Sequence, residues 1–147
     1  PMAHHIIPDI VKNQKICDML ETATALDAAR FMAERNVGAV VVTDENCRMI
    51  GIVTERDLTR KITAAGRDPK ETPLSTIMTR GPDALAPKDS PRDALELMQE
   101  RHIRHLPVVE DGTVIGIVSV RDLLSDALAT MERKMVSADD FLRRLVY

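Results

Sequence analysis

Two kinds of apolar spacing alternate along this chain, and together they predict a mixture of strands and helices. Short runs of branched residues at 40–42 and 106–109 predict buried strands, and the run at 49–53 follows the first of them after a polar turn. Apolar positions three or four residues apart predict a helix over about 25–35 and another that begins at Pro91. We therefore expect an α/β (α+β) protein.

The same order of elements occurs twice. Residues 51–58 (GIVTERDL) match 116–123 (GIVSVRDL) at an offset of 65, and 31–37 match 97–103 at an offset of 66. A repeat of this length is a whole β-α-β-β-α unit rather than one turn of a solenoid. One such unit is too small to bury both faces of its sheet, so we expect the two units to pack sheet to sheet with pseudo-twofold symmetry.

Polar residues with one glycine and two prolines mark a linker between the units. The predicted segments are an N-terminal entry at 1–9, a first unit at 10–65, the linker at 66–73, a second unit at 74–130 and a C-terminal tail at 131–147. We expect the helix after Thr54 to end near Ala65, and the last helix of the second unit to end near Met131. The tail segment 137–145 has a cap of its own and an apolar stripe, so it predicts a separate short helix docked on the body or on a partner chain.

Both copies place a hydroxyl residue and, three positions later, an aspartate where a strand runs into a helix. These pairs are Thr54 with Asp57 and Ser119 with Asp122. The spacing is that of a capping box, closed here by Asp instead of Glu or Gln. The free N–H groups and partial positive charge of such a helix start favour an anion. Capping alone does not require the arginine, Arg56 or Arg121, that both copies place inside the pair.

Composition narrows the range of functions. A net charge of −3 and an aromatic content of two Phe and one Tyr argue against a nucleic-acid binder. The apolar runs are too short for a membrane span. Cys17 and Cys47 have neither metal spacing nor a CxxC pairing, so we expect two reduced thiols in a cytoplasmic protein. His102 would end a helix and His105 would begin a strand, so the two histidines do not lie on one helix as zinc ligands would, and we expect no metal site. The sequence has no recognisable catalytic motif, so we expect no enzyme.

Three motifs in combination resemble a known family. They are NVGAVVV at 36–42, RHLPVV at 104–109 and the two GIV(T/S)xRDL copies. The chain resembles a tandem pair of cystathionine-β-synthase (CBS) domains, a Bateman module, over nearly its whole length. The resemblance implies a stand-alone regulatory module without a catalytic cofactor. It would bind an adenine nucleotide (AMP, ADP, ATP or NAD) between its repeats, form a homodimer and modulate an unidentified target protein. The alternative is a ligand-independent structural or interaction module.

The resemblance also assigns roles to residues. The aspartates would accept hydrogen bonds from ribose hydroxyls, the hydroxyl side chains would donate to ribose or phosphate, and the arginines would neutralise phosphate. One nucleotide site would combine Thr54, Arg56 and Asp57 with Thr79, Ala84, Arg104 and His105, and Pro107 would also take part in nucleotide binding. The other would combine Lys12, Gly38 and Ala39 with Ser119, Arg121 and Asp122. Since the second site has Gly38 and Ala39 where the first has Arg104 and His105, we expect less phosphate affinity there, more room for a base, and two unequal sites.

Overall fold

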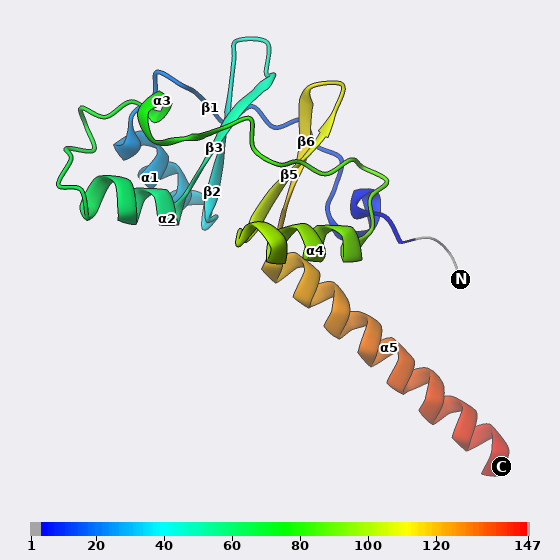
Figure 1. Cartoon of the computed structure of the whole chain (residues 1–147). Coiled ribbons are helices and arrows are strands. Elements are labelled where there is room, and N and C mark those ends of the chain that lie inside the picture. The colour runs from blue at the N-terminus through cyan, green and yellow to red at the C-terminus, as the bar shows by residue number, and fades with distance from the viewer. Residues whose placement is uncertain (1–3, 147) are drawn as a thin grey trace.

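The structure, a computed structural model, describes residues 4–146 and consists of two lobes side by side, each with a small sheet and helices (Figure 1). The elements up to the linker are η1 (Ile6–Ile10), β1 (Met19–Leu20), α1 (Ala25–Arg35), β2 (Ala39–Thr43), β3 (Met49–Thr54), α2 (Glu55–Asp57) and η2 (Leu58–Thr63). Those after it are α3 (Leu74–Ile77), β4 (Thr79–Arg80), α4 (Pro91–Arg101), β5 (His105–Glu110), β6 (Thr113–Ser119) and α5 (Val120–Val146). The predicted α+β class and the repeated order of elements are confirmed.

The two lobes exchange short strands. The first sheet has the order β1-β2-β3-β4, and β4 comes from the stretch after the linker, where Thr79 pairs with Ile52 of β3. In return, the segment before β1 lies along β6, with the Gln14 N–H donating to the Ile115 carbonyl at 2.9 Å. The strand expected at the start of the second unit is a single bridge, Leu85 to Val108. Each lobe is therefore completed by chain that belongs, by sequence order, to the other repeat.

Local capping explains where the two 11-residue helices, α1 and α4, begin and end. The Thr24 hydroxyl accepts from the Asp27 N–H at 3.1 Å, and Ser90 makes the same contact with Asp93 at 3.1 Å. Both helices end at a residue in the left-handed conformation, which satisfies their last carbonyls. The sequence predicted α1 over the same residues.

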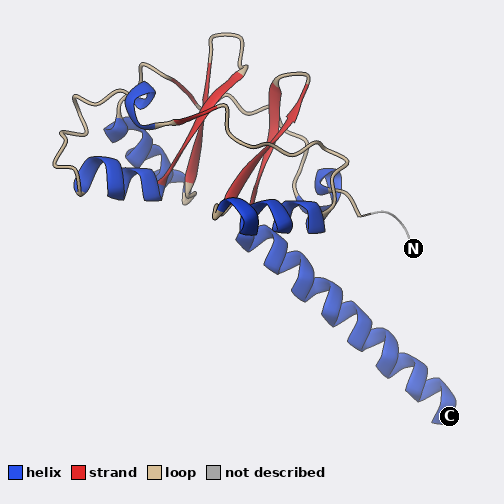
Figure 2. Ribbon diagram, viewed as in Figure 1, coloured by secondary structure: helices blue, strands red, loops and turns tan. Residues whose placement is uncertain are grey.

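Each lobe has its own buried cluster, and β2 is buried on both of its faces. Val40 and Val42 lie in the cluster under α1. Ala39, Val41 and Thr43 point to the other face and are also buried, between 0 and 4 % exposed. A strand buried on both faces is what sheet-to-sheet packing of the two units requires, and Figure 2 shows the two pairs of strands next to each other between the helices.

The tail does not form the separate helix that the sequence predicted. A single helix, α5, runs without interruption from Val120 to Val146 (Figure 1). The apparent cap at Ser137 lies inside it, because neither glycine nor proline follows Met131 to stop the helix. The first turns of α5 lie beside α4, and the rest extends away from the body.

The two cysteines are not separate thiols. Cys17 and Cys47 form a disulfide, with their Cα atoms 5.1 Å apart. Cys17 follows the segment that lies along β6, and Cys47 lies in the turn between β2 and β3. The prediction of two reduced thiols was wrong because it considered spacing along the chain, whereas the fold brings together residues that are 30 positions apart.

Candidate functional site

The two strand-to-helix junctions carry the capping boxes that the sequence predicted. The Thr54 N–H donates to Asp57 Oδ2 at 2.9 Å, and the Asp57 N–H donates to the Thr54 hydroxyl at 3.3 Å. At Ser119 and Asp122 the same two bonds are 2.7 and 3.2 Å. Each hydroxyl also donates to the Oδ2 atom of its aspartate. In both junctions, therefore, Oδ1 is left outside the cap.

Both junctions lie at the same end of the two hairpins. The strand register pairs Ala39 with Thr54 and His105 with Ser119, so the start of one strand meets the end of the next in each lobe. A backbone bond closes each junction in the same way. It joins the Glu55 N–H to the Gly38 carbonyl at 3.1 Å and the Val120 N–H to the Arg104 carbonyl at 3.0 Å.

Arg56 connects the two lobes at this end. Its Nη1 donates to the carbonyl of His102, the residue that ends α4, at 3.4 Å. Arg121, its counterpart in the second copy, is the second residue of α5 and is exposed. Both predicted phosphate-binding arginines are thus exposed, and Arg56 also contacts the neighbouring lobe.

Residues of the first predicted set lie along β4 and the segment that follows it. Thr79 pairs with Ile52, two residues before Thr54, because β4 completes the first sheet. The chain then passes Ala84 and reaches the second lobe, where the Leu85 N–H donates to the Pro107 carbonyl at 2.8 Å. Pro107 itself is buried within β5, so its carbonyl holds this crossing segment in place.

The N-terminal segment brings Lys12, one residue of the second predicted set, to the second lobe. Lys12 directly follows Val11, whose Cγ2 lies 3.1 Å from where a Cβ on Gly116 would be. Since Gly116 belongs to β6, this segment reaches the strand that leads to Ser119 and Asp122.

His105 fills the space beside Gly38. A Cβ added at Gly38 would lie 3.0 Å from the His105 Cε1 atom and 3.6 Å from the Glu55 carboxylate. The room for a base that we expected from small residues here is therefore taken by a side chain of the other repeat. Burial lowers the pKa of His105, although the nearby carboxylates of Glu55 and Asp122 favour its charged form. His105 thus lies between the two predicted sets and feels charges from both.

The two aspartates differ in their surroundings. Lys61 Nζ lies 3.1 Å from Asp57 Oδ1 and also donates to the Ile77 carbonyl at 2.8 Å. The matching position of the second copy is Asp126, which cannot make such a pair; His4 Nε2 lies 3.1 Å from its carboxylate. A carboxylate offers about four acceptor positions. The cap and Lys61 use three of them at Asp57, while the cap uses two at Asp122.

Sequence reasoning missed Glu55 and Lys61. Lys61 had a signal, because it stands four residues after Asp57 on a predicted helix, a spacing that favours an ion pair. Glu55 had none, since its approach to His105 depends on how the two repeats face each other.

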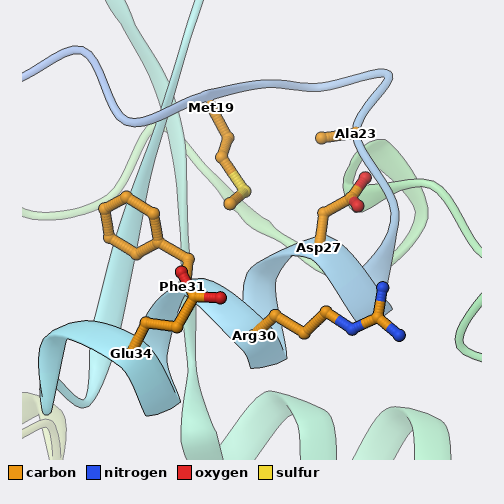
Figure 3. A pocket seen from close by; sticks show the side chains of 6 residues that line it. All are labelled: Met19, Ala23, Asp27, Arg30, Phe31 and Glu34. Carbon is orange, nitrogen blue, oxygen red and sulfur yellow. The ribbon is translucent and has the colours of Figure 1, made fainter.

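A surface hollow of about 360 Å³ lies elsewhere, between α1 and the preceding segment that carries Met19 and Ala23 (Figure 3). Phe31 and Met19 form its apolar wall, and Asp27, Arg30 and Glu34 line its rim. It includes no residue of the two predicted sets. Within residues 4–146, no group of three or more His, Cys, Asp or Glu side chains could hold a metal ion. In the same range, no helix combines the length and the apolar character needed to cross a bilayer.

Comparison with known proteins fits this architecture. The family model described as "CBS domain" matches the chain twice, at residues 20–64 and 74–129. A CBS domain-containing protein of Arabidopsis thaliana, CBSCBSPB5, is 38% identical over 128 residues, which are 85% of this chain and 23% of that protein. This chain thus spans about a quarter of the length of that relative.

Solved structures agree. A CBS-domain-containing protein from Agrobacterium tumefaciens matches with a TM-score of 0.77 and 28% identity, over 86% of this chain and 95% of that one. A hexameric CBS-CP12 protein from bloom-forming cyanobacteria matches with a TM-score of 0.75 and 30% identity, over 84% of this chain and 68% of that one.

Proposed function

Since this chain belongs to the CBS domain family and carries two copies of the domain, we propose that it is a regulatory module that binds an adenine nucleotide at the junction of its two repeats. Binding would change the relative position of the repeats and so alter the activity of a partner protein. Such a change requires that the nucleotide bind one arrangement more tightly than the other.

One observation carries the proposal: two strand ends, each followed by a hydroxyl, an arginine and an aspartate at the same spacing, lie at the same ends of the two hairpins, where Arg56 and His105 contact the other lobe. Each group has a carboxylate oxygen, Oδ1, outside the cap, which suits a ribose hydroxyl; at Asp57 this oxygen is shared with Lys61. Arg56, Arg121 and Arg104 supply positive charge within the same region, which suits phosphate. Capping alone would explain the aspartates but not the convergence of three arginines.

The test is calorimetric titration of the chain with AMP, ADP, ATP and NAD, after its ultraviolet spectrum has shown that no nucleotide co-purified. We expect saturable binding of at least one of them. Asp57→Ala and Asp122→Ala remove a charged hydrogen-bond acceptor, worth about 1.5–3 kcal/mol, so each should weaken its own site by roughly 10- to 100-fold.

Asp27→Ala and Asp93→Ala are the matched controls. These aspartates close the same type of capping box, but at the starts of α1 and α4, the ends of those helices away from the junction. All four substitutions should cost about 1 kcal/mol of stability by loss of a cap, and only the first two should change nucleotide affinity. Flat titrations of the wild-type chain, or equal loss in all four variants, would contradict the proposal and favour a ligand-independent interaction module.

A further inference from the structure

The outer part of α5 carries an apolar stripe that no other part of residues 4–146 covers. Every described side chain from Met131 to Leu145 is exposed, and Met135 reaches 70 % and Leu145 68 %. Figure 1 shows the helix leaving the body beside α4 and continuing alone to its end. A helical segment of about this length is marginal in water without packing. We therefore expect the stripe to pack against a binding partner.

The spacing of the stripe indicates what that partner is. Starting at Leu124, small or apolar residues recur at alternating steps of four and three. They are Leu124, Leu128, Met131, Met135, Ala138, Leu142 and Leu145. Three consecutive heptads of this kind are the seam of a coiled coil, and the seam is about 30 Å long at 1.5 Å per residue. A groove on an unrelated protein would not require a strict 3.5-residue repeat, whereas an identical helix would.

Charges beside the seam select the direction of pairing. In the heptad lettering a to g, with a and d in the seam, Met135 is at a, Lys134 is at g, and Glu132 and Asp139 are at e. In a parallel pair, each Lys134 therefore lies opposite Asp139 of the other helix. The antiparallel alignment that matches the same apolar layers would place Glu132 against Asp139, two like charges, on both sides. The charge pattern is thus complementary to a second copy in parallel register and repulsive in the opposite one.

We propose that α5 pairs with α5 of a second copy of this chain in a parallel two-stranded coiled coil along the Leu124–Leu145 seam. The outer half of the helix carries four cationic and three anionic side chains, so it lacks the basic excess that an anionic lipid surface would favour. This inference goes beyond the nucleotide site and does not depend on it, because none of the predicted nucleotide-binding residues lies in the seam.

Analytical ultracentrifugation of the full chain tests the pairing. Met135→Glu buries a charge in the seam. The matched control is Val136→Glu, which introduces the same charge one residue later, at a position that faces away from the seam. The two native side chains are 70 and 69 % exposed in the single chain, so neither change disturbs the body. We expect a dimer for the wild type and for Val136→Glu at about 50 µM, and at least a roughly 100-fold weaker dimer for Met135→Glu.

A cysteine pair tests the direction. In the parallel coil, position 138 of one helix faces position 138 of the other across the axis. Ala138→Cys should therefore cross-link two chains under oxidising conditions, and the control Val136→Cys should not. Both variants keep the native Cys17–Cys47 pair. Three results would overturn the proposal. They are a monomeric wild type at about 50 µM, a Met135→Glu dimer as tight as that of Val136→Glu, and equal cross-linking of the two cysteine variants. A monomer that sediments with anionic vesicles would assign the stripe to a membrane instead.

Discussion

Substitution of Gly51 by alanine tests how the exchanged strand β4 positions the candidate site. A Cβ at Gly51 would lie 2.7 Å from the Met78 Sδ atom and 2.9 Å from the Thr79 carbonyl oxygen. The sulfur can move, but the carbonyl belongs to the backbone of β4, which is hydrogen-bonded to β3. Alanine at this position must therefore push β4 outward, and Thr79 with it.

The expected cost follows from this contact. Overpacking of this kind costs about 1–3 kcal/mol, and for a chain of this size each kcal/mol lowers Tm by about 4 °C, so Tm should fall by about 4–12 °C. Gly116 is the matched control, because it occupies the same position in the second copy. A Cβ there meets the Val11 Cγ2 atom at 3.1 Å, the end of a side chain that can yield by a few tenths of an ångström. We expect Gly116→Ala to lower Tm by less than half as much as Gly51→Ala.

Thermal unfolding followed by circular dichroism measures both shifts, and titration with the nucleotide that the wild type binds measures the effect on the site. Because Thr79 is displaced in Gly51→Ala, affinity should fall there and not in Gly116→Ala. Equal Tm values for the two variants would show that β4 gives way freely. Gly51 would then not be what allows the close approach of β4.

Three further predictions concern stability. Reduction of the Cys17–Cys47 disulfide should lower the free energy of unfolding by up to about 3.6 kcal/mol, the loop-closure value for a separation of 30 residues. Reductant should leave the Tm of the control Cys47→Ser unchanged. A wild-type Tm that does not fall on reduction would contradict this prediction. Burial raises the pKa of Asp18 above its ordinary 3.8, so the folded chain binds the proton more tightly and stability should fall as pH rises above that value. Asp18→Asn, which can still accept from the Val41 N–H, should remove this slope in melts from pH 4 to 7. Burial lowers the pKa of His105 below 6.5, so stability should be lost as pH falls from 6.5 through the lowered pKa of the folded chain. If His105→Gln loses stability with falling pH as the wild type does, His105 is not the source of this pH dependence.

Features with local signals could be predicted from the sequence. The cap at Thr24 and the break after Arg35 bound α1 through interactions within a few residues, so spacing was sufficient to locate it. The duplication was equally accessible, because the two GIV(T/S)xRDL copies keep both their sequence and their capping geometry. Fold class and the pairs Thr54/Asp57 and Ser119/Asp122 follow from signals of this kind.

Features that depend on contacts between distant segments were missed. The exchange of β4 and of the segment at Gln14 requires knowing which sheet edge is open, and neither segment differs in composition from an ordinary short strand. The disulfide depends on the same crossing of the chain. The length of α5 was missed for another reason. A local cap signal at Ser137 was given more weight than the absence of any helix breaker after Met131.

His105 makes the two candidate sites dependent on each other. Its ring lies against Gly38 of one predicted set, and its charge state responds to Glu55 at the start of α2 and to Asp122 near the start of α5. A bound phosphate near this ring would favour the protonated form, against the burial that keeps it neutral. Nucleotide binding as proposed should therefore be accompanied by uptake of up to about one proton per chain at pH values just above the lowered pKa of His105. Titrations in two buffers with different ionisation enthalpies measure this uptake directly. An equal uptake in wild type and His105→Gln would show that the phosphate lies elsewhere, whereas its loss in the variant would locate the phosphate beside the residue that both repeats share.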